Sequence, residues 1–370
     1  MSRDPILLAV DSLQIGGTER QIVELIRGLR QSGRHRILLA LLDRGGRFDA
    51  EAIEHAAAIL PVRRRARFDC TPALSLRWQA RRAGVRLIHA VGRMSALAGL
   101  AVARGIGVPI INGSIRSAPV PLDRRDRISR WCAMRSDWIV ANSRAGLIAH
   151  GLGDHPRAQV IANGIDLSRF AGVIPAEHDA SSICMVANFS KRKDHATLIR
   201  ALPLIRRAIP DARLILIGGD FGTLADSRQL AHRLGLDAIV RFVTDSARPE
   251  SLIAASRVCV LASHSESFAN AVLEYMALAK PVVATDTCGD TAGLIGDAGF
   301  LVPHGSVDSL AARISELLGD PQRARTMGEA GRRRVQAFTV TRMVAEYEAL
   351  FDRLLAAARP ALPMRDAGHG

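Results

Sequence analysis

Short runs of apolar residues, each about the length of a β-strand, recur along the first half of the chain. The segment Thr18 to Gln31 has helical spacing and separates the first two of these runs. The runs are Ile6 to Val10, Ile37 to Leu42, Leu87 to Ala90, Pro109 to Ile111, Trp138 to Ala141 and Gln159 to Ala162. Continuous apolar strands separated by helices are typical of a parallel sheet that is covered on both faces. The first half therefore predicts a doubly wound α/β domain.

The same pattern starts again after a stretch with Gly, Pro and Asp. Its predicted strands are Ile183 to Ala187, Arg213 to Ile217, Val240 to Val243, Val258 to Ala262, Pro281 to Thr285 and Gly299 to Val302. Its predicted helices are Ala196 to Ala208, Ser227 to Leu234, Pro249 to Ser256, Asn270 to Ala279 and Ser306 to Leu318. We expect two Rossmann-like, doubly wound α/β domains, 1–170 and 183–339, joined by the linker 171–182. Two such domains face a central cleft, where ligands bind at the carboxyl ends of the strands.

The end of the chain predicts one more helix, over 340–358, with apolar residues on one face. We expect this face to pack back on the protein. The remaining tail, 359–370, is rich in Pro and Gly and is expected to be disordered.

Composition places the chain among folded globular proteins, because 48% of its 370 residues are apolar and 23% are charged. The five cysteines are odd in number, widely spaced and without a CxxC pair, so neither a disulfide framework nor a zinc site is indicated. A reducing cytosol fits this usage. The apolar run Ile6 to Val10 is too short for a signal-peptide core, and no run is long enough to span a bilayer.

The formal charge of +14 lies almost entirely in the first half. Residues 1–175 hold 27 arginines against 14 acidic residues, whereas the rest holds 23 basic and 22 acidic residues. The arginine clusters are Arg63, Arg64, Arg65 and Arg67; Arg77, Arg81, Arg82 and Arg86; and Arg124, Arg125, Arg127 and Arg130. Such a face suits an anionic membrane surface or a phosphate-bearing acceptor. A solvated basic face explains it equally well, and nucleic acid is disfavoured because few aromatic residues are interleaved.

The segment from Ser263 to Glu274 carries the most informative chemistry. Glu266 and Glu274 are eight residues apart, the first in a polar loop after a predicted strand and the second inside a predicted helix. In helical geometry this spacing lets both acids share one face with Asn270. The loop residues Ser267, Phe268 and Ala269 come directly before a predicted helix, whose N-terminal N–H groups could bind an anion such as a diphosphate.

This segment reads S-E-S-F-x-N-A-V-L-E and closely resembles the E-x7-E motif of the retaining glycosyltransferases of family 4, which have the GT-B fold. The resemblance implies that Glu266 contacts the donor sugar, that Glu274 holds the ribose hydroxyls, and that neighbouring loop residues line the donor site. The likeness extends over nearly the whole chain, but it is dense only from Ile183 onward.

A second match to this family follows the first strand of the second half, at Val186 to His195. The family places an Arg and a Lys five residues apart here, to neutralise the diphosphate leaving group. Lys193 stands at the Lys position, whereas Asn188 stands at the Arg position. The resemblance therefore implies a catalytic pair of Lys193 and Glu266, with Asn188 beside the donor and with Lys191 or Arg192 as the remaining sources of positive charge.

In the first half, Gly16 and Gly17 lie in a loop that resembles the family's G-G-x-E-R loop, where the backbone approaches the donor phosphate or the acceptor. Many relatives carry a His after the strand that matches Pro109 to Ile111, but this chain has none there. Arg116 is a candidate contact of the acceptor or a phosphate. His89 is favoured as a core residue over a base, and a general base remains unassigned.

The resemblance implies transfer of a sugar from a nucleoside diphosphate donor, expected to be a UDP-sugar, to an acceptor hydroxyl with retained configuration. The acceptor would be a glycan or lipid-linked glycan of cell-surface polysaccharide synthesis, and no metal or cofactor besides the donor is expected. The predicted location is cytoplasmic, at the inner face of the membrane. A nucleotide-sugar epimerase is disfavoured by the family-like sequence from Glu266 to Glu274. A catalytically silent nucleotide-sugar-binding subunit remains open because of Asn188 and the missing His.

Overall fold

The computed structural model describes residues 4–14, 16–62, 71–118, 121–176, 181–244, 246, 249–287 and 289–358. The chain divides into two compact units, one of residues 1–164 with 340–370 and one of residues 165–339. The tail 359–370 and part of the predicted linker, residues 177–180, lie outside the described residues. In the part that is described, no helix is both long enough and apolar enough to cross a bilayer.

The division between the units falls after Gly164 rather than after Phe170, where the sequence pattern places the end of the first domain. Contacts of the intervening residues explain the difference. The Ile165 N–H donates to the Phe338 carbonyl at 2.8 Å, and Ile165 forms an isolated parallel bridge with Thr339. Phe170 packs in a core of the second unit.

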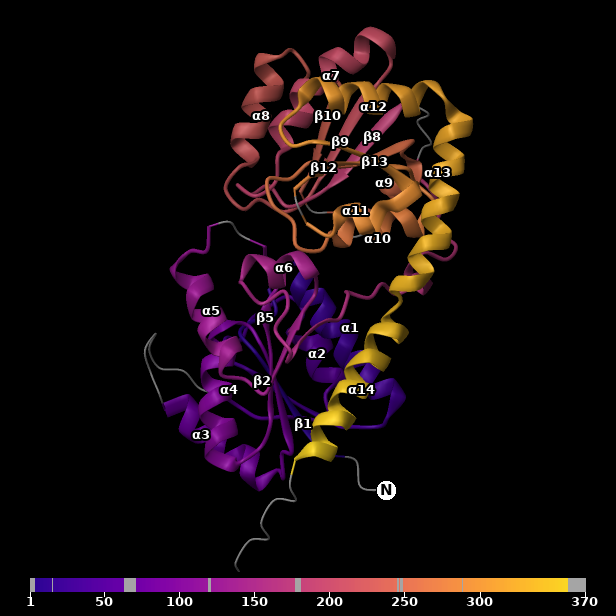
Figure 1. The fold of residues 1–370 in the computed structure, drawn as a ribbon. Coiled ribbons are helices and arrows are strands. Elements are labelled where there is room, and N and C mark those ends of the chain that lie inside the picture. Colours follow the sequence, from indigo (N-terminus) through magenta and orange to yellow (C-terminus); the bar gives the residue numbers. More distant parts are fainter. Residues whose placement is uncertain are drawn as a thin grey trace, which may run out of the picture. The chain divides into compact units, whose positions relative to one another are not determined.

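The first unit is built on a parallel sheet with the strand order β3-β2-β1-β4-β5-β6-β7 among the described residues (Figure 1). Its strands are β1 (Pro5–Val10), β2 (Arg36–Leu41), β3 (Ala58–Ile59), β4 (Leu87–Val91), β5 (Ile110–Ile115), β6 (Trp138–Ala141) and β7 (Ala158–Val160). The order reverses between β1 and β4, because the chain runs outward from β1 to β3 and then returns to the other side. This confirms the predicted doubly wound topology.

Alternate residues of these strands enter two different cores, one on each face of the sheet. Leu8 and Leu39 pack with α1 and α14, whereas Leu7 and Leu38 pack with α3 and α4. The helices are α1 (Gly17–Ser32), α2 (Asp49–His55), α3 (Thr71–Arg82), α4 (Arg93–Ile106), α5 (Arg124–Met134), α6 (Arg144–Ala149) and α14 (Val340–Ala357).

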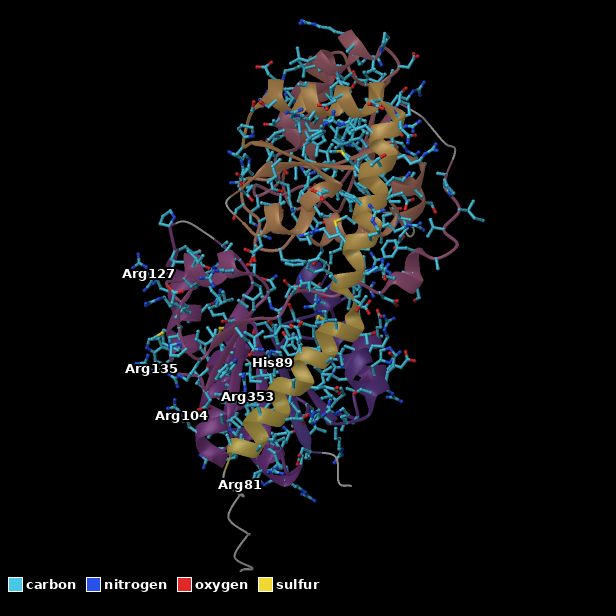
Figure 2. The ribbon with its side chains drawn as sticks, turned by 45° about the vertical axis from the view of Figure 1, so that its right-hand side comes forward. Arg81, His89, Arg104, Arg127, Arg135 and Arg353 are labelled. Carbon is cyan, nitrogen blue, oxygen red and sulfur yellow. The ribbon has the colours of Figure 1, made fainter. Side chains whose placement is uncertain are left out.

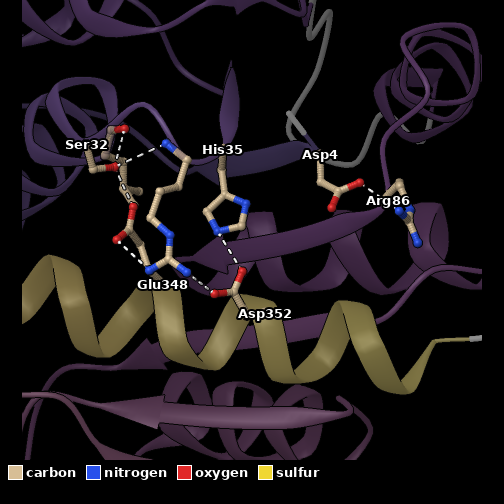
Figure 3. A network of polar contacts seen from close by, with 8 residues as sticks. Asp4, Ser32, His35, Arg86, Glu348 and Asp352 are labelled. Carbon is tan, nitrogen blue, oxygen red and sulfur yellow. Dashed lines mark hydrogen bonds and ion pairs between the residues drawn. The ribbon is translucent and has the colours of Figure 1, made fainter. Parts of the chain in front are cut away.

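Helix α14 comes from the end of the chain and is fastened to the first unit by the polar contacts of Figure 3. Arg34 pairs with Glu348, at 3.3 Å between Nη1 and Oε2, and also with Asp352. The Nε2 atom of His35 lies 3.2 Å from Oδ1 of Asp352, and the Ser32 hydroxyl donates to Glu348. Glu348 is 4% exposed, so its charge is compensated where it is buried.

The second unit holds a parallel sheet with the order β10-β9-β8-β11-β12-β13 in its described residues. Its strands are β8 (Ser182–Val186), β9 (Arg213–Ile217), β10 (Val240–Val243), β11 (Val258–Leu261), β12 (Val282–Asp286) and β13 (Gly299–Pro303). The chain runs outward from β8 to β10 and then crosses to the other side of β8. The point of reversal therefore lies between β8 and β11, and ligands bind at this position in open α/β sheets.

Helices cover both faces of this second sheet (Figure 1). Ile183 and Met185 pack with α7, α8 and α12 on one face, and Cys184 packs with α9, α10 and α11 on the other. The helices are α7 (His195–Ala208), α8 (Leu224–Arg233), α9 (Pro249–Ala255), α10 (Asn270–Ala277), α11 (Thr291–Ile295), α12 (Val307–Gly319) and α13 (Pro321–Arg334). Short 3-10 turns are η1 (Leu167–Phe170), η2 (Gly296–Ala298) and η3 (Val335–Phe338).

Candidate functional site

The strand order of the second sheet reverses between β8 and β11. These strands pair only at Ile183 with Val258 and at Cys184 with Cys259 within the described part of the chain. Beyond these pairs the hydroxyl of Tyr275, which is fully buried in α10, takes the place of a direct ladder bond. It accepts the N–H of Val186 at 2.7 Å and donates to the carbonyl of Val260 at 3.2 Å. Tyr275 thus sets the distance between the two strands whose following loops carry the candidate catalytic residues.

The side chains of Lys193 and Glu266 meet at this reversal point of the sheet. Lys193 lies in the loop after β8 and Glu266 in the loop after β11, and their side chains form an ion pair. The Ser263 hydroxyl donates a second hydrogen bond to Oε1 of Glu266 at 2.8 Å. The backbones of Lys193 and Ser263 form an antiparallel bridge, so the two loops are held together by main chain as well as by side chains. The Lys193 and Glu266 side chains are 19% and 12% exposed, which leaves both within reach of a ligand.

The loop that contains Glu266 leads directly into α10. Ser267 and Ala269 are buried, and Phe268 packs against a core of the second unit. The loop also passes so close to Gly289 that a Cβ there would lie 2.4 Å from the Glu266 carbonyl oxygen. The path of this loop, and with it the position of the Glu266 carboxylate, is therefore fixed by packing.

Helix α10 begins at Asn270, as predicted, and Glu266 lies in the loop before it, so Glu266 does not share a helical face with Asn270 and Glu274. Asn270 and Glu274 are one turn apart on α10, whereas Glu266 reaches Lys193 from an irregular loop. Burial raises the pKa of the Cys184 thiol on β8 to about 12, and the charge of Glu274 adds to this rise.

The N-cap residue of α10 is Ala269, whose side chain makes no capping hydrogen bond. Helix α7, which starts beside Lys193, is different, since Asp194 caps it by accepting the Thr197 N–H at 3.0 Å. Backbone N–H groups of an uncapped helix N-terminus attract anions. The residues around Glu266 therefore combine an ammonium group, a carboxylate and a helix N-terminus suited to phosphate.

Asn188 has a structural partner in the loop after β9. Its Oδ1 accepts the N–H of Gly219 at 3.1 Å. The two loops also touch through the backbone, because a Cβ on Gly218 would lie 2.1 Å from the Ala187 carbonyl oxygen. The amide of Asn188 thus joins the loops after β8 and β9, and it brings no positive charge to the position where the family has Arg.

Gly16 and Gly17 belong to the first unit, at the start of α1. Gly16 is the N-cap residue in an extended conformation, and Gly17 is the first residue of the helix. The carboxylate of Glu19 folds back toward Gly16, so that a Cβ there would lie 2.2 Å from its Oε2. Directly after β1, at the start of the same loop, Asp11 Oδ1 accepts the Ser95 N–H at 2.6 Å and therefore occupies the N-terminus of α4.

His89 is a core residue, as the sequence favours (Figure 2). It is 1% exposed and its ring lies 5.1 Å from that of Tyr347 on α14. Burial, together with the nearby charge of Arg116, lowers the pKa of His89 to about 3. Arg116 itself donates to the Tyr347 hydroxyl at 3.2 Å and to the Gly113 carbonyl at 3.2 Å. Both residues are therefore engaged in holding α14 on the first sheet.

A separate hollow of about 440 Å³ lies in the second unit at α13 and η3. Its lining residues are Asp297, Ala330, Arg333, Arg334, Ala337 and Phe338. None of the residues predicted for the donor site lines it. Sequence reasoning did not identify Tyr275 or Ser263 as parts of the site, although Ser263 opens the segment that carries the family motif and Tyr275 directly follows it.

Family models match both halves of the chain. Residues 15–169 match the model described as Glycosyltransferase Family 4, and residues 170–334 match the model described as Glycosyl transferases group 1. A D-inositol 3-phosphate glycosyltransferase of Kribbella flavida is 33% identical over 202 residues, or 49% of this chain and 47% of that protein. One of the same name from Kineococcus radiotolerans is 30% identical over 290 residues, or 69% of this chain and 63% of that protein. The chain thus spans about half to two thirds of these relatives.

Among solved structures, Alr3699/HepE of Anabaena in complex with UDP has the same fold, with a TM-score of 0.81 at 23% identity. The similarity covers 94% of this chain and 100% of that one. Two parallel α/β sheets with this architecture, and two family models that together span residues 15–334, lead to one assignment. The chain belongs to the group 1, family 4 glycosyltransferases and has their GT-B fold.

Proposed function

We propose that this chain transfers a sugar from a UDP-sugar to an acceptor hydroxyl, with retention of configuration at the anomeric carbon. The observation that carries the proposal is the Lys193–Glu266 pair at the reversal point of the second sheet. A departing diphosphate develops negative charge, which a positioned ammonium group and backbone N–H donors stabilise. Lys193 and the N-terminus of α10 supply these groups, and Glu266 would accept a hydrogen bond from a sugar hydroxyl.

The donor class is supported by the relatives. Those from Kribbella flavida and Kineococcus radiotolerans are named as glycosyltransferases, and Alr3699/HepE has been solved with UDP and with UDP-glucose. The retaining outcome and the role of Glu274 in holding ribose rest on the family likeness of the segment from Ser263 to Glu274. Gly16 and Gly17 remain candidates for phosphate or acceptor contacts in the first unit.

The acceptor we propose is a lipid-linked glycan of cell-surface polysaccharide synthesis, presented at an anionic membrane surface. Figure 2 shows exposed arginines of the first unit, among them Arg81, Arg104, Arg127 and Arg135. Large apolar side chains are exposed on the same helices, namely Leu74 and Trp78 on α3 and Ile128, Trp131 and Met134 on α5. Arginine and aromatic side chains together suit the interface of an anionic bilayer. The cluster Arg63, Arg64, Arg65 and Arg67 lies outside the described residues.

A screen of nucleotide sugars by thermal shift, followed by turnover assays, tests this proposal. We expect a UDP-sugar to raise the melting temperature, to be hydrolysed slowly, and to be transferred faster to acceptors in anionic vesicles than in zwitterionic ones. Glu266→Ala should lower kcat/KM by about 100-fold. Glu329→Ala, which removes an exposed carboxylate of α13, is the matched control and should leave kcat/KM unchanged.

A catalytically silent nucleotide-sugar-binding subunit is the second candidate, and the Asn188 side chain favours it. This residue brings no charge to the family's Arg position and is bonded to Gly219. Binding of a UDP-sugar without transfer or hydrolysis would support the silent subunit. Undiminished transfer by Glu266→Ala would contradict the site that we assign.

A further inference from the structure

Three potential metal ligands lie beside the Lys193–Glu266 pair, on the other side of the same two backbone segments. They are Asp194, His264 and His304, and their ligand atoms all lie within 4.8 Å of one another. Lys193 and Ser263 pair in an antiparallel bridge, so the residues that follow each of them point to the opposite side. Asp194 and His264 therefore form a cluster that is separate from the proposed donor site.

We propose that Asp194, His264 and His304 form a binding site for a divalent transition metal of the zinc class. Imidazole nitrogen and carboxylate oxygen are the ligands that Zn²⁺ takes in proteins, with bonds of about 2.0–2.2 Å. Tetrahedral geometry at these bond lengths separates neighbouring donor atoms by about 3.3–3.5 Å. His264 Nδ1 lies 2.6 Å from His304 Nε2, and His264 Nε2 lies 4.0 Å from Asp194 Oδ1. These contacts use different nitrogens of His264, of which one would ligate the ion, and one ligand atom from each of the three residues lies within 4.8 Å of the others.

The side chains can make this adjustment, because both imidazoles are exposed while the backbone beneath them is fixed. The side chain of His264 is 48% exposed, and the backbone N–H of His264 donates to the Arg192 carbonyl at 2.8 Å. His304 stands at the tip of a tight turn that follows β13, which the Ser306 N–H closes on the Pro303 carbonyl at 3.1 Å. Gly305 supplies the positive φ of 73° in this turn. The two exposed rings can therefore rotate toward a common ion while the backbone that carries them stays in place.

Asp194 is the buried member of the cluster, and its carboxylate is already oriented. It caps α7 by accepting the Thr197 N–H at 3.0 Å and the Thr197 hydroxyl at 2.6 Å. A carboxylate has further lone pairs toward His264, and metal-bound carboxylates are typically held by such hydrogen bonds from behind. The cap is also the ordinary structural role of this residue, so the test must separate capping from metal binding.

Binding would fasten three loops at the carboxyl edge of the second sheet: those after β8, β11 and β13. The first two of these loops also carry Lys193 and Glu266, so the ion would hold the candidate catalytic loops in place without entering the sugar-transfer chemistry. The site stands independently of the proposed function, because its ligands and its test do not involve a donor.

Titration of the purified chain with Zn²⁺ against a chromophoric chelator tests the site, with Co²⁺ absorption as a second readout of tetrahedral coordination. We expect one Zn²⁺ per chain, a raised melting temperature and weaker binding at acidic pH, where imidazoles are protonated. His264→Ala and His304→Ala should each weaken Zn²⁺ binding by about 100-fold and abolish the Co²⁺ bands.

Two further variants separate the alternatives. Asp194→Asn keeps a good helix cap but removes the negative charge, so it should weaken Zn²⁺ binding with little change in melting temperature of the metal-free protein. His232→Ala removes an exposed histidine that lies 3.0 Å from Asp237 and should bind Zn²⁺ like the parent. Failure of the parent chain to bind Zn²⁺, or equal binding by His264→Ala and His304→Ala, would overturn the proposal.

Discussion

Replacement of Lys193 by alanine is expected to lower kcat for sugar transfer by about 10²–10³-fold, the usual loss when one stabilising donor is removed from a transition state. Lys193 faces Glu266 at the reversal point of the second sheet, and Asn188 provides no second cation there. Charge that develops on the departing diphosphate would then be left mainly to the N-terminus of α10. Steady-state kinetics with the UDP-sugar found by screening measures the loss.

Lys191→Ala is the matched control, because Lys191 belongs to the same loop but its side chain is exposed. We expect its kcat to stay close to that of the parent protein. Equal losses from Lys191→Ala and Lys193→Ala would show that only the total charge of the loop matters. A Lys193→Ala variant that raises KM but keeps kcat would place Lys193 in ground-state binding instead.

Acidification is expected to destabilise the first unit through His89, by about 2–3 kcal/mol between pH 7 and pH 4.5. Burial, together with the nearby charge of Arg116, lowers the pKa of His89 from its ordinary value of 6.5 to about 3 in the folded chain, because both disfavour the imidazolium. Between these values the unfolded chain binds the proton and the folded chain does not. Stability from this residue is therefore complete above pH 6.5 and falls steadily as the pH drops toward 3.

His89→Leu removes the titrating group while keeping a similar volume, so the difference in urea midpoint between this variant and the parent should grow as the pH falls. Neither ring nitrogen of His89 has a hydrogen-bond partner, which makes a leucine acceptable at pH 7 as well. His232→Gln changes an exposed histidine and should leave the pH dependence as it is. A constant difference between His89→Leu and the parent at all pH values would refute the account.

The strands of both sheets could be predicted because buried parallel strands appear in the sequence as continuous apolar runs. Ile183 to Ala187 and Val258 to Ala262 correspond closely to β8 and β11, which are buried on both faces. Lys193 and Glu266 were predicted as site residues from the resemblance to the family motifs, and in the structure their side chains form an ion pair. Their roles in transfer stay predictions.

Helix α13 and the end of strand β5 could not be predicted from runs of apolar residues. Helix α13 buries only Ala324, Gly328 and Gly331, so its contact face consists of small residues in an arginine-rich segment rather than of large apolar ones. Strand β5 continues through Asn112 to Ile115, beyond the predicted end at Ile111, because Ile115 pairs with Ala141 of β6 after a shift in register. Both features depend on tertiary partners rather than on local pattern.

The residues around the site show the same limit. The bond from Gly219 to Asn188 and the bridging hydroxyl of Tyr275 join segments that are far apart in the sequence. The loop position of Glu266 and the helix start at Asn270 could be predicted, but the spacing of Glu266 and Glu274 could not show where the Glu266 side chain points. Helical periodicity applies only within one regular element, and the path of the loop before α10 is set by its packing.

A crystal structure of the protein with the UDP-sugar found by screening tests the central claim most directly. We expect a diphosphate oxygen within about 3 Å of Lys193 Nζ, further oxygens at the N–H groups of the first turn of α10, and a sugar hydroxyl that donates to Glu266. A diphosphate bound elsewhere, for instance beside Arg333 and Arg334, with Lys193 still paired to Glu266, would contradict it.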